Sequence, residues 1–135
     1  MSRAEISTAK RVVIKVGSSS LTGSAGAELD PSAVQKVVDF AYSFKSQGAE
    51  VVVVSSGAIA AGLSPLGLKV RPRDLATQQA AASVGQGLLI AQYSEKFQAH
   101  GVISSQVLLT TEDVVRRSHY ANAQQTLSKL LARIS

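Results

Sequence analysis

Apolar and polar positions along the chain follow two periodicities, which predict strands separated by helices. Residues 12–16 read Val-Val-Ile-Lys-Val, and residues 51–54 are four consecutive valines. Apolar β-branched runs without polar alternation are typical of strands that are covered on both faces in a parallel sheet. A third apolar run, residues 102–109, predicts a third strand.

Helical spacing fills the intervals between these runs. Asp30-Pro31 predicts the start of a first helix, with Asp as N-cap and Pro at the first helical position, and Gly48 predicts its end. Asp74 predicts the N-cap of a long Ala-rich helix that extends to about Phe97. The first of these helices has apolar residues at helical spacing: Val34, Val37, Val38, Ala41 and Phe44.

Two further helices are expected. One begins within the segment 55–62, directly after the second strand, and the last begins at Thr110-Thr111, where Glu112 and Asp113 favour a helix start. The last helix has apolar residues along one face: Tyr120, Ala123, Leu127, Leu130, Leu131 and Ile134.

Two glycines, Gly85 and Gly87, lie inside the predicted long helix. Each destabilises a helix by about 1 kcal/mol relative to alanine. Their presence predicts that another backbone approaches this helix closely, either from the same chain or from another subunit.

The order of elements predicts an α/β fold, a three-layer αβα sandwich with a mainly parallel sheet. Parallel strands joined through helices require crossover connections, and ligands of such folds bind beyond the carboxyl ends of the strands. Two Gly/Ser-containing segments, residues 17–27 and 55–62, follow strand ends of this kind. The first is long enough to close over a ligand.

Composition limits the possible classes of protein. A chain of 135 residues with 45% hydrophobic and 17% charged residues fits one globular domain at most. No apolar run approaches the roughly 20 residues of a membrane helix, and the first ten residues lack a secretory signal, so we expect a cytoplasmic location. There is no cysteine, and His100 and His119 are far apart in the sequence, so we expect no structural metal.

Positive charge suits an anionic partner. The net charge of +5 and the pI of about 9.8 fit either a small anion or a nucleic-acid surface. Because the basic residues are scattered and only 4% of residues are aromatic, we expect no nucleic acid to be bound.

Candidate chemistry gathers at the two strand ends. Lys15 precedes Gly17, Ser18 and Ser19, which places a cation beside exposed backbone N–H groups and suits phosphate. The alternative is an ordinary turn in which Lys15 only reaches water. The segment 55–62 could hold a second anion on its backbone N–H groups, or its small residues could only allow tight packing.

Two common nucleotide motifs are absent. Residues 57–64 have the glycine spacing of a Walker A loop, but Leu63 stands where that motif requires lysine. No Gly-x-Gly-x-x-Gly follows either of the first two strands, so a dinucleotide site has no support.

Four segments together resemble the glutamate 5-kinase family, within the amino acid kinase superfamily. They are Lys15-Val16-Gly17-Ser18-Ser19, the segment from Ser55 to Gly62, Ala82-Ser83-Val84-Gly85-Gln86, and Tyr120-Ala121-Asn122-Ala123. The similarity covers residues 11–135 in order. Relatives acting on other acceptors usually carry a second glycine where this chain has Ser18, which favours the glutamate kinases.

The resemblance implies an activity. ATP, with Mg²⁺, would phosphorylate the side-chain carboxylate of L-glutamate to glutamyl 5-phosphate, the first step of proline biosynthesis. A carboxylate with a reference pKa of about 4.3 is already ionised at neutral pH, so no general base is needed. The family implies catalysis by Lys15, binding of the ATP phosphates by Lys15, Gly17, Ser18 and Ser19, and binding of glutamate by Ser56, Gly57 and Ala58.

The resemblance also implies an incomplete site. Residues 1–135 correspond to the N-terminal, substrate-binding half of the kinase domain, without the nucleotide-binding half, so we expect the isolated chain to be inactive. Family precedent implies a homo-oligomer and proline as feedback inhibitor. The alternatives are a non-catalytic folding or oligomerisation piece, or another member of the superfamily.

Overall fold

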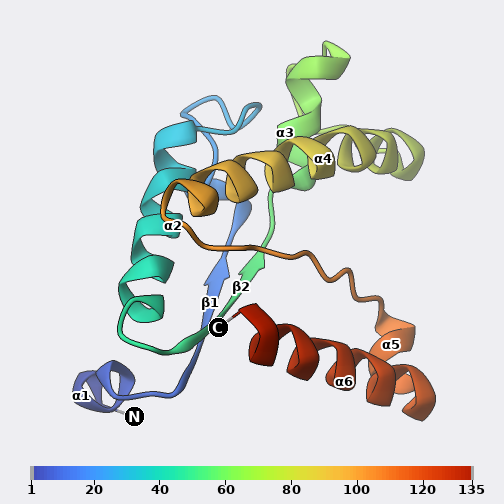
Figure 1. The fold of residues 1–135 in the computed structure, drawn as a ribbon. Coiled ribbons are helices and arrows are strands. Elements are labelled where there is room, and N and C mark those ends of the chain that lie inside the picture. The colour runs from blue at the N-terminus through green and yellow to red at the C-terminus, as the bar shows by residue number, and fades with distance from the viewer. Residues whose placement is uncertain (1, 135) are drawn as a thin grey trace.

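The computed structural model describes residues 2–134. This part of the chain forms six α-helices, two strands and two short 3-10 turns (Figure 1). In order, they are α1 (Arg3–Ser7), β1 (Arg11–Val16), η1 (Ser18–Ser20), α2 (Pro31–Lys45), β2 (Glu50–Ser55), α3 (Ala58–Leu63), η2 (Ser64–Leu66), α4 (Leu75–Ala99), α5 (Thr111–Val115) and α6 (Arg117–Ile134).

Strands β1 and β2 form a parallel sheet. Their register runs from Arg11 opposite Glu50 to Val16 opposite Ser55. Helix α2 connects them, as a crossover between parallel strands requires. The two strands and the α/β class predicted from the valine-rich runs are therefore confirmed.

The signals that predicted helix α2 are confirmed. The Asp30 carboxylate accepts a hydrogen bond from the backbone N–H of Ser32, and Pro31 occupies the first turn. The helix ends at Lys45, and Gly48 turns the chain with a φ of +90°. A left-handed residue of this kind near a helix end is most easily glycine, because it has no Cβ atom to clash.

The core lies where α2 and α4 cover one face of the sheet. Its buried members come from both helices, from β1 and from the segment after η1: Val16, Leu21, Val34, Val38, Leu89 and Tyr93. Ile14 and Val53, which are neighbours across the two strands, pack against this cluster.

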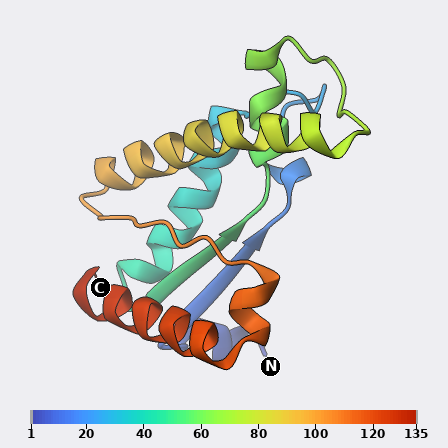
Figure 2. The same ribbon diagram turned by 90° about the vertical axis from the view of Figure 1, so that its right-hand side faces the viewer.

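The opposite face of the sheet is only partly covered. Helix α6 lies on that side near the amino ends of the strands, so the sheet stands between α2 and α6 (Figures 1 and 2). Val13 and Val54 remain 61% and 49% exposed. The expectation that residues 51–54 are covered on both faces is therefore wrong at Val54, because α6 does not extend to the carboxyl end of β2.

The prediction of a third strand over residues 102–109 is wrong. This segment connects α4 to α5 as extended, irregular backbone (Figure 2). Ile103 and Leu108 are 71% and 72% exposed, and the sheet of the described residues contains β1 and β2 only. A strand needs a ladder of backbone hydrogen bonds to a neighbour, which an apolar run favours but does not supply.

The last helix begins where predicted, but the expectation of one continuous helix is wrong: α5 ends at Val115, Arg116 has extended backbone with a ψ of 120°, and α6 begins at Arg117. The Thr110 hydroxyl accepts from the backbone N–H of Asp113, whose carboxylate accepts from the backbone N–H of Thr110. On α6, the predicted apolar face is half-buried from Ala123 to Ile134, whereas Tyr120 is exposed. The Lys45 ammonium donates to the Ile134 carbonyl at 2.8 Å, which ties the end of α6 to the end of α2.

Candidate functional site

The two segments proposed to hold ligand lie side by side. The parallel register places the carboxyl ends of β1 and β2 next to each other, and Ser56 N–H donates to the Val16 carbonyl at 2.9 Å. This bond continues the pairing one step past the strands. The loop after β1 and helix α3 therefore emerge at the same end of the sheet (Figure 1).

The loop after β1 makes a tight 3-10 turn. Ser20 N–H donates to the Gly17 carbonyl at 3.1 Å, and Leu21 N–H donates to the Ser18 carbonyl at 3.0 Å. These bonds leave the backbone N–H groups of Ser18 and Ser19 without a partner in the described chain. Leu21 is completely buried and anchors the turn in the core.

The rest of this loop folds back on itself. Thr22 and Leu29 form an antiparallel bridge, and Asp30 N–H donates to the Leu21 carbonyl at 2.8 Å. The Ser64 hydroxyl donates to the Glu28 carboxylate at 2.6 Å, which ties the loop to the turn after α3. The segment 17–27 is thus ordered by its own hydrogen bonds next to the strand ends.

The segment after β2 turns sharply into α3 at Gly57. Its φ of +111° is left-handed backbone that a residue with a side chain rarely adopts. A Cβ atom there would lie 3.5 Å from Leu21 Cδ1, so the turn also packs on the anchor of the first loop. Ser56, the residue before it, is exposed, and Ala58 begins the helix.

A small hollow joins the two segments. It has a volume of about 210 Å³, below the roughly 300–1,000 Å³ of clefts for drug-sized ligands, so it suits a small metabolite or part of one. The residues that line it come from the first loop, from α3 and from the connection to α4: Ser18, Ser19, Thr22, Gly26, Ile59, Ala60, Leu63 and Arg71.

The candidate residues from the sequence reach this hollow only in part. Ser18 and Ser19 line it, whereas Gly17, Ser56, Gly57 and Ala58 do not, although Ile59 and Ala60, the next residues of α3, do. Lys15 is also outside the lining; it is exposed and occupies a position on β1 that alternates with the core-facing Ile14 and Val16.

Sequence reasoning missed Thr22 and Arg71. Neither follows a strand end directly, and their place in the hollow depends on how the first loop and the connection between α3 and α4 fold back. The available signal was the Pro/Gly/basic composition of residues 65–73, which marks a turn but not its direction.

Charge and polarity at the strand ends favour an anion. The Lys15 ammonium and the Arg71 guanidinium have no hydrogen bond or ion pair with any residue from 2 to 134. Cations without a local partner raise the concentration of anionic ligands near them. At the end of β2, the Ser55 and Tyr93 hydroxyls lie 2.9 Å apart, and burial raises the pKa of Tyr93, which keeps this phenol neutral.

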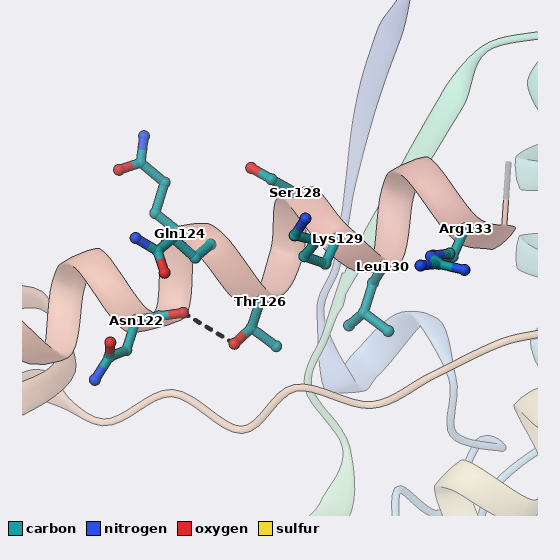
Figure 3. Close-up of a pocket in the computed structure, with 8 residues that line it drawn as sticks. Asn122, Gln124, Thr126, Ser128, Lys129, Leu130 and Arg133 are labelled. Carbon is teal, nitrogen blue, oxygen red and sulfur yellow. Dashed lines mark hydrogen bonds between the residues drawn. The ribbon is translucent and has the colours of Figure 1, made fainter.

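A larger hollow of about 710 Å³ lies along α6 (Figure 3). All the residues that line it belong to this one helix: Asn122, Gln124, Gln125, Thr126, Ser128, Lys129, Leu130 and Arg133. The Thr126 hydroxyl already donates a hydrogen bond to the Asn122 carbonyl at 2.9 Å (Figure 3). This hollow is near the amino ends of the strands and brings no groups from different elements together, so we place the candidate site at the smaller hollow.

Within residues 2–134, no group of three or more His, Asp or Glu side chains gathers as a metal ion would require. No helix in the same range is long and apolar enough to cross a membrane.

Comparisons with known proteins identify the family. A model of the amino acid kinase family matches residues 10–134. Three similar relatives are each named glutamate 5-kinase. The chain is 60% identical over 129 residues to that of Salinispora arenicola, 57% over 129 to that of Thermobifida fusca, and 58% over 130 to that of Streptomyces coelicolor.

Each alignment covers 96% of this chain and 33% to 35% of the relative, so the chain spans about a third of their length. The family model spans both strands, both strand-end segments and the long helix that packs on them. The chain therefore belongs to the amino acid kinase family.

Proposed function

We propose that this chain contributes the acceptor-binding half of a glutamate 5-kinase. The reaction is ATP-dependent phosphorylation of the side-chain carboxylate of L-glutamate, which gives glutamyl 5-phosphate and ADP and opens proline biosynthesis. The observation that carries the proposal is the adjacency of the two strand-end segments, with Lys15 on one strand and the hollow beside Ser18 and Ser19. The identity of 57% to 60% to proteins named glutamate 5-kinase supports the choice of substrate.

The reaction requires little acid–base catalysis by the protein. A carboxylate oxygen of glutamate attacks the γ-phosphorus of ATP, and the bond from that phosphorus to the bridging oxygen of ADP breaks. The nucleophile is already ionised at neutral pH, so no proton moves in this step. What remains is in-line positioning and neutralisation of charge on the transferred phosphoryl group.

The residues of the first loop suit that task. Lys15 is the proposed catalytic residue, because its ammonium group is free of local partners and can neutralise negative charge on the phosphates. The free N–H groups of Ser18 and Ser19 would donate to phosphate oxygens. At Gly17 nothing lies within 4 Å of a would-be Cβ atom, so a ligand has room to approach the backbone there.

Glutamate would lie against the second segment. Ser56 offers an exposed hydroxyl, and Gly57 and Ala58 present backbone beside it. The left-handed conformation of Gly57 sets the direction in which this backbone leaves β2. The same conformation and its contact with Leu21 also fit the packing alternative, and the two interpretations are compatible.

Mg²⁺ is expected from the reaction, but the described hollow offers no ligand set for it. None of its lining residues is a carboxylate, and the nearby Glu28 is bonded to Ser64. Mg²⁺ commonly binds through substrate phosphates and one or two carboxylates. The residues of the hollow therefore do not by themselves form a Mg²⁺ site.

The proposal extends to partners that follow from the family. As partners, the family implies further copies of the chain in a homo-oligomer and proline as a feedback inhibitor, with no nucleic acid bound. It also implies a cytoplasmic location. Gly85 gives no support for the oligomer, because the backbone that approaches it is Ala58 of the same chain. Nothing lies within 4 Å of a would-be Cβ at Gly87, so no backbone of the described residues approaches it, and an approach by another subunit stays a prediction.

A chimera tests the kinase proposal. This chain would replace the aligned 129 residues of the Thermobifida fusca relative, and acyl phosphate would be trapped with hydroxylamine after incubation with ATP and L-glutamate. We expect product to depend on both substrates, with little product from L-aspartate or N-acetylglutamate as acceptor. A chimera as stable as its parent that makes no product would refute the proposal, and a preference for another acceptor would assign another member of the superfamily.

A non-catalytic role is the second candidate. The exposed valines Val13 and Val54 and the unpaired extended segment 103–109 favour association through backbone and apolar contacts. Sedimentation of the 135-residue chain distinguishes the candidates. Stable self-association without acyl phosphate in the chimera would favour the assembly role, whereas we expect the isolated chain to be inactive under either proposal.

A further inference from the structure

Arg71 is the one charged residue among the described residues that line the 210 Å³ hollow. It belongs to the connection between η2 and α4, whereas the other polar residues of the lining belong to the first loop. The apolar part of the lining comes from α3, with Ile59 and Leu63 among its members. Arg71 is exposed overall, and its planar guanidinium group can bind a carboxylate or phosphate in a bidentate manner.

The backbone around Arg71 is held in place at both ends. Before it, Leu68 N–H donates to the Leu63 carbonyl at 2.9 Å, next to the left-handed turn at Gly67. After it, the Gln78 side-chain amide donates to the Pro72 carbonyl at 2.8 Å. Because a residue before proline is restricted to extended backbone, Pro72 further limits the conformations of Arg71.

The guanidinium of Arg71 itself is available. It makes no hydrogen bond or ion pair with any side chain or carbonyl between residues 2 and 134. Two other residues of the lining, Ser18 and Ser19, have backbone N–H groups that are also without partners in the described chain. Residues with unpaired donors from two separate segments therefore line one small space, which suits an oxyanion with several acceptor oxygens.

We infer that Arg71 is a substrate-binding residue that holds an anionic oxygen group in this hollow. The inference deepens the proposed kinase function and rests on it for the identity of the ligand. The anion is a carboxylate of glutamate, presented from the α3 side, or a phosphate of ATP, presented from the side of Ser18 and Ser19. A guanidinium fork binds either group in the same bidentate manner.

Binding to the 135-residue chain tests the inference without turnover. L-glutamate and inorganic phosphate would be titrated separately while the backbone amide resonances of Ser19 and Ala60 are followed. We expect Arg71→Gln to weaken binding of at least one probe by roughly 10- to 100-fold, the range for a lost charge-assisted hydrogen bond. Arg71→Lys should recover part of this loss, because it restores the charge but not the fork.

Arg73 provides the matched control. It lies in the same exposed connection and carries the same charge, but it does not line the hollow. Arg73→Gln should leave both affinities within about 2-fold, as expected of a solvated surface charge. Equal losses for the two variants, an unchanged affinity for Arg71→Gln, or no binding of either probe by the unsubstituted chain would each overturn the inference.

The kinase chimera then assigns the bound group. If Arg71→Gln raises the KM for glutamate alone, the bound group is the carboxylate; if it raises the KM for ATP alone, the bound group is the phosphate. Either result supports the inference. Unchanged KM values and an unchanged kcat contradict it. Arg71-dependent binding in a chimera that makes no acyl phosphate would refute the kinase function and retain the anion site. The thermal midpoint of each variant confirms that the fold is intact.

Discussion

Gly85 of α4 lies directly against the backbone of Ala58 at the start of α3. A Cβ atom on Gly85 would be 1.7 Å from the Ala58 carbonyl oxygen, far inside any allowed contact. The reciprocal contact occurs one turn along, where a Cβ atom on Gly62 would be 1.9 Å from the Ala81 carbonyl oxygen. The two helices therefore cross backbone to backbone, and α4 fixes where the proposed glutamate-binding segment lies.

This contact predicts the effect of Gly85→Ala. Because backbone rather than a flexible side chain occupies the space, the two helices must separate, and we expect the free energy of unfolding to fall by about 3 kcal/mol or more. Gly87→Ala is the control, since nothing lies within 4 Å of a Cβ there. In an exposed helix interior it should raise stability by about 0.5–1 kcal/mol. Urea unfolding of the chain measures both, and similar effects at the two positions would contradict the crossing.

Lys15 predicts a separation of activity from folding. Its side chain is exposed and has no partner in the described chain, so Lys15→Ala should leave the thermal midpoint nearly unchanged. In the kinase chimera it should lower kcat by at least about 100-fold, as for loss of one group that stabilises transition-state charge. The control is Lys10→Ala, which removes the same charge just before the amino end of β1. Parental turnover in Lys15→Ala would assign this lysine a surface role.

The strand-end segments were predictable because their signals are local. The valine runs identify β1 and β2, Asp30-Pro31 identifies the start of α2, and the parallel order alone brings the two carboxyl ends together. Ser18 and Ser19 followed directly from their place after β1. The glycine inside the long helix likewise predicted a close backbone contact, which is confirmed at Gly85.

The missed features depend on partners far along the chain. Residues 102–109 have strand-forming composition, but in the described chain their backbone has no neighbouring strand to pair with. Arg71 reaches the hollow because η2 and Gly67 turn the connection back toward the first loop, which no local pattern specifies. Tyr120 is exposed because α6 covers only the amino end of the sheet.

Leu21 predicts how strongly the first loop depends on the core. It is completely buried and packs against the turn at Gly57, so it connects the two segments of the site through the core. Leu21→Ala should lower the free energy of unfolding by about 2–5 kcal/mol, through lost burial and the cavity left behind. Leu66→Ala, at an exposed position, should change it by no more than about 0.5 kcal/mol. A small effect at Leu21 in urea unfolding would show that the loop is not anchored there.

Asp74 predicts a pH dependence of helix α4. Hydrogen bonding to Thr77 holds the pKa of the Asp74 carboxyl below its usual value of 3.8, and the carboxylate caps the helix by accepting from the Thr77 backbone N–H. A group whose pKa is lowered on folding stabilises the native state above its unfolded pKa, and this contribution is lost as the pH falls through the folded pKa. The stability advantage of the parent over Asp74→Asn should therefore be constant above about pH 5 and shrink as the solution becomes more acidic. Asparagine is the control because it caps helices well but does not titrate. Urea unfolding of both proteins between about pH 7 and pH 2.5 measures the difference, and a difference that stays constant through the acid range would contradict the capping role of the carboxylate.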